Sequence, residues 1–116
     1  MSNLGNLAEI VDEAARNATA VPQLTIDAPD LTPDDGYAIQ AMAMARRLSR
    51  GERRVGMKRG LTSRAKMIQV NVEEVIWGRL TDGMRVEEGG FASMADYVHP
   101  RVEPEIAFLM GAPLSG

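Results

Sequence analysis

The chain has 116 residues, of which 45% are hydrophobic and 25% charged, and its net charge is -3. This length suffices for one domain with a real core, and the balanced composition argues against a disordered or membrane-embedded protein. The absence of cysteine excludes disulfides and thiolate metal sites, and the acidic balance offers no excess positive charge to nucleic acid. The first ten residues lack the regions of a signal peptide, so a cytoplasmic location is expected.

Two amphipathic helices are predicted in the first half of the chain. Apolar residues recur at spacings of three and four from about residue 2 or 3 to residue 18. The run Thr32-Pro33-Asp34-Asp35 predicts the start of a second helix, with a threonine cap, a proline and two acids in the first turn. This helix should end near Ser49, before Gly51. Its expected buried face comprises Tyr37, Ala41, Met44, Ala45 and Leu48.

The connector and the end of the second helix carry two further signals. Residues 19–31 contain Pro22 and Pro29, which predicts an extended connector. A cluster of arginines around the end of the helix favours the negative end of the helix dipole, and this interpretation is preferred over a nucleic-acid surface. The cluster comprises Arg46, Arg47, Arg50, Arg53 and Arg54.

A different pattern follows, in which residues 55–58 are predicted to form a short strand. Residues 60–63 read as a turn into a short helix that ends near residue 69. Such a turn exposes backbone N–H groups that suit a carboxylate or phosphate, and Lys58 lies just before it. The simpler interpretation, preferred from these residues alone, is that Thr62 and Ser63 only cap the helix and that Lys58 is a surface lysine.

Two more strands are predicted, over residues 84–86 and 97–110. In the second, Glu103 and Glu105 are two residues apart, so their side chains should share a face. Two like charges on one face repel each other, so the pair favours a positive partner. A divalent metal would suit it. The alternatives are that both glutamates are solvated, or that they pair with Arg101 and another basic residue.

Three blocks of sequence resemble the hydratase/decarboxylase branch of the fumarylacetoacetate hydrolase superfamily. They are residues 56–67, 77–84 and 99–108, which read GMKRGLTSRAKM, WGRLTDGM and HPRVEPEIAF. They occur in the family's order with similar spacing. The resemblance implies an α+β fold in which a helical N-terminal region, residues 1–52, precedes the start of a β-rich catalytic core, residues 53–116. Because the relatives are longer, the C-terminal half of that core is expected to lie outside this sequence.

The resemblance also implies a metal-dependent lyase that acts on a small 2-oxo acid. Glu103 and Glu105 would be two ligands of Mg2+ or Mn2+, and a third carboxylate would come from a strand further along the chain. Lys58 matches a catalytic lysine that holds a developing enolate or a substrate carboxylate, or that moves a proton. His99 is interpreted as structural. The expected substrate-binding residues are Leu61, Thr62, Ser63 and Ile76.

The expected reaction is the decarboxylation of 2-oxo-3-hexenedioate to 2-hydroxypenta-2,4-dienoate, a step in the meta-cleavage degradation of aromatic compounds. Hydration of 2-hydroxypenta-2,4-dienoate is the runner-up, because hydratases tend to carry an acid immediately before the aromatic residue of Trp77-Gly78, where Ile76 stands here. A non-catalytic fragment or association module is a further alternative. The resemblance implies a homo-oligomer, with association with the partner hydratase, and neither nucleic acid nor membrane as a partner.

Overall fold

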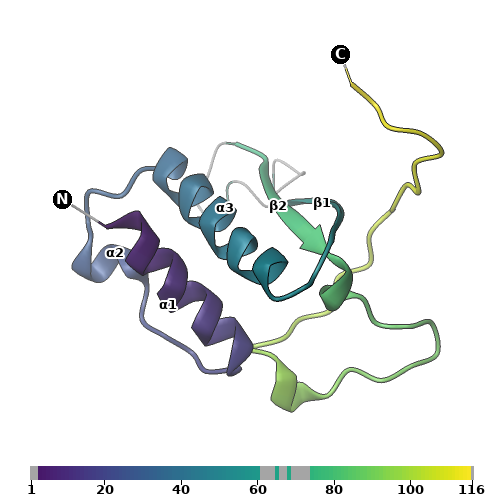
Figure 1. Cartoon of the computed structure of the whole chain (residues 1–116), viewed down its shortest axis with the longest axis horizontal. Coiled ribbons are helices and arrows are strands. Elements are labelled where there is room, and N and C mark those ends of the chain that lie inside the picture. The colour runs from purple at the N-terminus through teal and green to yellow at the C-terminus, as the bar shows by residue number, and fades with distance from the viewer. Residues whose placement is uncertain (1–2, 61–64, 66–67, 69–73, 116) are drawn as a thin grey trace.

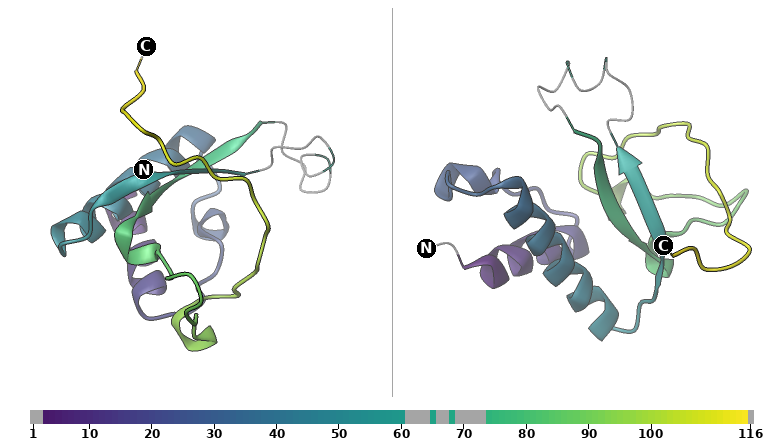
Figure 2. Two further views of the ribbon diagram at one scale, coloured as in Figure 1. Left: turned by 90° about the vertical axis from the view of Figure 1, so that its right-hand side faces the viewer. Right: turned by 90° about the horizontal axis from the view of Figure 1, so that it is seen from above.

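The structure, a computed structural model, describes residues 3–60, 65, 68 and 74–115. Helices followed by a small antiparallel sheet make an α+β fold, as the sequence predicts. Figures 1 and 2 show the order of the layers, which is α1, α3, the sheet, and then the C-terminal segment on the far side of the sheet. The elements are α1 (Leu4–Arg16), α2 (Leu24–Asp27), α3 (Pro33–Ser49), β1 (Arg54–Gly60), β2 (Ile76–Thr81) and the 3-10 turns η1 (Asp82–Met84) and η2 (Met94–Asp96).

The two long helices, α1 and α3, run side by side in the same direction and enclose the core (Figure 1). α1 begins at Asn3, whose side chain accepts a hydrogen bond from the Asn6 backbone N–H at 3.2 Å. It ends at Arg16, two residues before residue 18, where the sequence predicts its end. The buried apolar side chains of the described residues are Ala8, Ile39 and Met44.

The start of α3 forms as its sequence predicts. The Thr32 hydroxyl accepts a hydrogen bond from the Asp35 backbone N–H at 3.1 Å, and the Asp35 carboxylate accepts one from the Thr32 backbone N–H at 2.9 Å. This capping box satisfies two backbone donors that the helix leaves unpaired. The helix ends at Ser49, and Gly51, with a φ of +100°, turns the chain toward the sheet.

Two predictions in the helical half are wrong. The predicted buried face of α3 is rotated, because Ile39 is buried whereas Ala45 and Leu48 are exposed. α3 contacts α1 on one side and β2 on the other, so its buried surface does not follow a single apolar stripe. The connector over residues 19–31 is not extended throughout, since it contains the one-turn helix α2 between its two prolines.

Neither of the last two predicted strands forms. Residues 97–110 take no regular secondary structure and are exposed, and residues 84–86 lie at and after the end of η1. A strand requires a hydrogen-bonded neighbour as well as a suitable side-chain pattern. In the described part of the chain the sheet has two members, β1 and β2, and these residues are not among them.

The predicted strand over residues 55–58 is part of β1, which pairs with β2 in an antiparallel register. Lys58 lies opposite Gly78, and a β-bulge at Val55 separates this register from the pairing of Arg54 with Thr81. Residues opposite each other share a face of the sheet, as do residues two apart along a strand. Lys58 and Trp77 therefore lie on opposite faces. Trp77 stacks on Tyr37 of α3, so the face that carries Lys58 points away from that helix.

Within the described ranges, no helix combines the length and the apolar character needed to cross a lipid bilayer.

Candidate metal and substrate site

A cluster of three charged residues lies on the face of the sheet that points away from α3. The ammonium Nζ of Lys58, on β1, donates a hydrogen bond to Oε1 of Glu105 at 2.6 Å and lies 3.6 Å from Oε2 of Glu103. Both glutamates belong to the C-terminal segment, which runs along this side of the sheet (Figure 2). The structure thus brings together the predicted catalytic lysine and the two predicted metal ligands, which we call the Lys58 cluster.

The Lys58 cluster is open to solvent and electrostatically balanced by its lysine. The side chains of Lys58, Glu103 and Glu105 are 47%, 53% and 44% exposed. The hydrogen bond with Glu105 raises the pKa of Lys58, so the ammonium stays protonated at neutral pH. The same bond lowers the pKa of Glu105. The alternative of basic partners for the two carboxylates is thus met in part: the partner is Lys58, and among the described residues Arg101 forms no ion pair with either glutamate.

The donor atoms of the cluster suit a hard divalent cation. Carboxylate oxygens are the ligands that Mg2+ and Mn2+ prefer, and Glu103 and Glu105 both approach a single atom, Nζ of Lys58. Among the described residues, no group of three or more His, Asp or Glu side chains is placed to hold a metal. Because Mg2+ is commonly bound by one or two carboxylates together with water and substrate oxygens, two glutamates fit such an ion.

Of the other predicted site residues, some are described by the structure and some are not. Ile76 begins β2 opposite Gly60, and a side chain at Gly60 would meet Ile76 Cγ1 at 3.1 Å, so Ile76 lies on the same face as Lys58. It offers this face a half-exposed apolar side chain. His99 is exposed and has a φ of +47°. Leu61, Thr62 and Ser63 lie outside the described residues, as does most of the helix predicted after them.

Helix α3 holds β2 through Gln40, along the edge of the strand that does not pair with β1. The Gln40 side-chain amide donates to the Trp77 carbonyl at 3.2 Å, and its oxygen accepts from the Arg79 backbone N–H at 3.1 Å and from Arg79 Nη1 at 2.9 Å. The Trp77 ring stacks on Tyr37 with a centroid distance of 5.0 Å, and Arg79 Cζ lies 4.6 Å from the Trp77 ring centre. These contacts hold β2, the strand that pairs with the strand of Lys58. No local pattern in the sequence identifies Gln40 as the residue that makes them.

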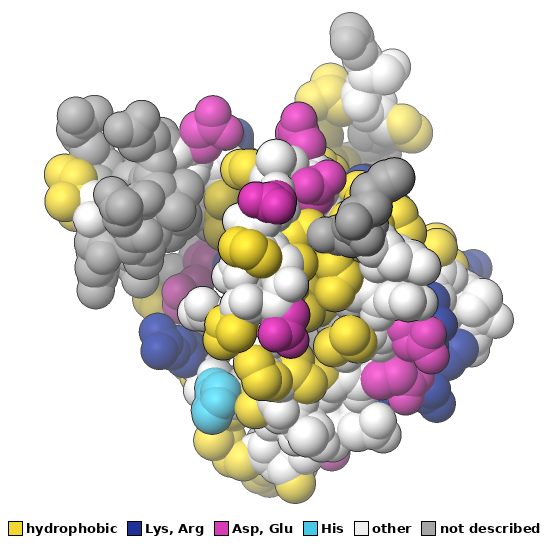
Figure 3. All heavy atoms as spheres, turned by 90° about the vertical axis from the view of Figure 1, so that its left-hand side faces the viewer, with side chains coloured by type: hydrophobic (Ala, Val, Ile, Leu, Met, Phe, Trp, Pro, Cys, Tyr) yellow, Lys and Arg dark blue, Asp and Glu magenta, His cyan; other side chains and the backbone are white. Residues whose placement is uncertain are grey.

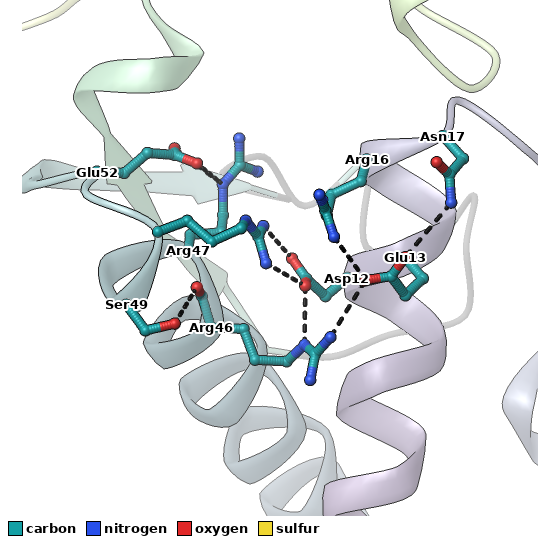
Figure 4. Close-up of polar contacts among 9 residues, drawn as sticks. Asp12, Glu13, Arg16, Asn17, Arg46, Arg47, Ser49 and Glu52 are labelled. Carbon is teal, nitrogen blue, oxygen red and sulfur yellow. Dashed lines mark hydrogen bonds and ion pairs between the residues drawn. The ribbon is translucent and has the colours of Figure 1, made fainter.

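A second charge network joins α1 to the end of α3 (Figure 4). Asp12 is only 3% exposed, and it accepts hydrogen bonds from Arg50 Nη1 and Nη2 at 2.6 and 2.7 Å and from Arg46 Nε at 2.8 Å. These bonds, with Arg50 first, lower the pKa of Asp12 to about 2. Two arginines of the cluster seen in the sequence therefore act as partners of a buried acid. This agrees with their interpretation as residues of a helix end.

A cavity of about 690 Å³ lies among the three helices, away from the Lys58 cluster. Figure 3 looks onto this side of the molecule and shows hydrophobic side chains gathered over the helices, with acidic side chains among them. The lining of the cavity is largely apolar and includes Val11, Leu24, Leu31 and Ile39.

The chain is similar to decarboxylases in both sequence and fold. It is 51% identical over 113 residues to a 4-oxalocrotonate decarboxylase from a Pseudomonas species, a match that covers 97% of this chain and 44% of the relative. A solved structure of the Pseudomonas putida G7 4-oxalocrotonate decarboxylase, complexed with magnesium and adipate, matches with a TM-score of 0.67 and 40% identity. That match covers 69% of this chain and 30% of the solved chain. The chain is homologous to part of these decarboxylases.

Hydratases are related to the chain more distantly. A 2-keto-4-pentenoate hydratase from Paraburkholderia xenovorans is 36% identical over 107 residues, which cover 92% of this chain and 40% of the hydratase. These names confirm the predicted resemblance to the hydratases and decarboxylases. No family model matches the chain. The chain spans less than half of the length of the relatives that it matches.

Proposed function

We propose that the protein is a metal-dependent lyase that decarboxylates 2-oxo-3-hexenedioate to 2-hydroxypenta-2,4-dienoate. The observation that carries the proposal is the convergence of Lys58 with Glu103 and Glu105 from segments 45 or more residues apart, with hydrogen-bond contact between Lys58 and Glu105. The identity to a decarboxylase over almost the whole chain supports the reaction. The adipate in the related structure supports the substrate class, because adipate is also a six-carbon dicarboxylate.

In the proposed site, Glu103 and Glu105 would hold Mg2+ or Mn2+. When bound, the divalent cation supplies a Lewis acid that stabilises negative charge on a 2-oxo oxygen. Lys58 supplies a protonated ammonium on the same side of the sheet, where it can donate a hydrogen bond to the substrate's C1 carboxylate or to the developing enolate oxygen. Residues 61–63 are the proposed contacts for the substrate carboxylate.

The bond changes follow from the substrate. The bond between C5 and the distal carboxylate breaks, and its electron pair moves through the unsaturated chain to the 2-oxo oxygen while CO2 leaves. A proton then adds to that oxygen, and we assign its donation to Nζ of Lys58. Ile76 offers an apolar surface on this face. An apolar neighbour disfavours a carboxylate more than it disfavours neutral CO2, which promotes loss of the carboxylate.

Hydration of 2-hydroxypenta-2,4-dienoate is the second candidate, because hydratases are also among the relatives. Ile76 favours the decarboxylase, since an isoleucine cannot transfer a proton to or from water. For the whole protein we also propose a cytoplasmic homo-oligomer that associates with the partner hydratase. The exposed apolar side chains of Val102, Ile106, Phe108 and Leu109 are consistent with a contact surface.

The test measures both reactions with the full-length protein and Mg2+. We expect CO2 release from 2-oxo-3-hexenedioate that is faster than water addition to 2-hydroxypenta-2,4-dienoate. The double variant Glu103→Gln, Glu105→Gln should lose CO2 release by about a hundredfold or more, because it keeps the shape of the side chains and removes the charges that bind the cation.

A matched control is Glu87→Gln, Glu88→Gln, which removes two charges from an exposed turn outside the Lys58 cluster. It should retain activity. Unchanged CO2 release in the Glu103 and Glu105 double variant would disprove the metal assignment. Water addition without CO2 release by the native protein would reverse the order of the two candidate reactions.

A further inference from the structure

We propose that Lys58 is the internal counter-ion of the metal site, so that its ammonium and a divalent cation compete for Glu103 and Glu105. Binding of the cation then releases Lys58 from the carboxylates and makes its ammonium available to the substrate. This inference rests on the proposed function, because it assumes that the two glutamates bind the metal. It adds an exchange of one cation for another as the step that prepares the lysine.

The contacts of Lys58 use the same groups that a metal would use. Its Nζ lies 2.6 Å from Glu105 Oε1 and 3.6 Å from Glu103 Oε2, which places one positive charge between the two carboxylates. Two cations on one carboxylate oxygen lie only a few ångströms apart and repel each other strongly. A dication that takes up these oxygens therefore weakens the hold of the carboxylates on Lys58.

The surrounding structure permits the exchange without disrupting the fold. The backbone of Lys58 is fixed by the pairing of β1 with β2. Its side chain is about half exposed, so it can swing into solvent without leaving a cavity. The glutamates lie on a segment without regular secondary structure, and their carboxylates can adjust to a cation smaller than an ammonium group. Exchange therefore requires side-chain rotations alone.

The experiment is a titration with Mn2+, in which free Mn2+ is measured by electron paramagnetic resonance. It compares the native full-length protein with Lys58→Met and with the matched control Arg59→Met. Arg59 follows Lys58 on β1 and lies opposite Trp77, on the other face of the sheet. Both variants remove one positive charge from the same strand. We expect Lys58→Met to bind Mn2+ about three- to tenfold more tightly than the native protein, and Arg59→Met to stay within about twofold.

The outcomes of the titration distinguish the proposed competition from the metal site on which it rests. Equal or weaker Mn2+ binding by Lys58→Met, when the native protein binds the ion, overturns the competition and leaves the metal site standing. A failure of all three proteins to bind Mn2+ overturns the metal site and the competition together. A second measurement follows the Lys58 ammonium by proton–nitrogen NMR of the native protein. Mg2+ should make the ammonium hydrogens exchange faster with water, and an exchange rate that is unchanged at saturating Mg2+ overturns the proposal.

Discussion

Asp12 is a carboxylate buried between two arginines, and its charge is tolerated because hydrogen bonds replace the lost water. Arg50 approaches it with two nitrogens, a geometry that a guanidinium provides and an ammonium does not. The pKa of Asp12 falls from 3.8 to about 2. A lowered folded-state pKa contributes stability that is fully present above the unfolded pKa, near 4, and is lost as the pH falls through about 2.

Asp12→Asn should therefore lower the free energy of unfolding by about 2 kcal/mol near pH 7, and by progressively less between about pH 4 and pH 2. The measurement is urea unfolding followed by the fluorescence of Trp77, the sole tryptophan of the sequence. Glu13→Gln is the matched control, because Glu13 is a half-exposed acid of the same network and should cost less. A loss that is equal at both ends of the pH range would show that packing, and not charge, is responsible.

The most important contacts at the scale of single residues could not be predicted from the sequence. Asp12 interrupts an apolar stripe, and a stripe analysis reads it as a surface acid, because its partners lie 34 and 38 residues away. No local pattern pairs Lys58 with Glu105, which is 47 residues away, and only the resemblance to a family assigns both residues to one site. The chemical character of Lys58, Glu103 and Glu105 was visible in their motifs. Their proximity depends on how distant segments fold, which no local pattern specifies.

Elements differ in how far their sequence determines them. The start of α3 is encoded by four consecutive residues that satisfy one another's hydrogen bonds, so both its start and its end were predicted. Residues 97–110 have the composition of a strand, but a strand also needs a partner whose position the segment does not encode. Strand β2 is not predicted from its own sequence. Its partners lie elsewhere in the chain, in β1 and in Gln40 of α3, which pairs with the backbone at Trp77 and Arg79.

Replacement of Gln40 by methionine, of similar length, should loosen β2. Gln40→Met removes two hydrogen bonds to backbone groups of the strand, and we expect a loss of about 1–2 kcal/mol in the free energy of unfolding. The amide hydrogen of Arg79 should also exchange faster with solvent, as measured by NMR. Gln23→Met, at an exposed glutamine with no side-chain cap bond, is the control. If the exchange of Arg79 were unchanged, Gln40 would not be what protects the strand.

At the scale of the whole molecule, the Lys58 cluster joins the C-terminal segment to the sheet. The cluster pairs half-exposed charges, and such pairs weaken as salt screens them. The apolar side chains of the segment are exposed and it pairs with no strand, so few other interactions hold it against the sheet. The position of Glu103 and Glu105 should therefore respond to ionic strength more than the packing of α1 against α3, where the central carboxylate, Asp12, is buried.

A fluorescent acceptor on residue 109 tests this expectation, because the sequence has no cysteine and Leu109→Cys gives a single attachment site at a fully exposed position. Energy transfer from Trp77 should report a longer and broader distance in about 1 M NaCl than at low salt. Lys58→Met should give the same change at low salt, and Arg59→Met should not. A distance that is insensitive to both salt and Lys58→Met would mean that other contacts hold the segment.

The bulge at Val55 has a consequence for how the chain tolerates changes in length. Arg54 pairs with Thr81 and Gly56 with Leu80, so Val55 is an extra residue that the ladder accommodates without a partner. Loss of Val55 would straighten the strand and leave Lys58 opposite Gly78. Between Gly56 and Lys58 the pairing is regular, so an added residue there would shift the register. Lys58 would then lie on the face of α3, away from its carboxylates. Deletion of Val55 should therefore be tolerated, whereas insertion of one residue between Gly56 and Lys58 should not.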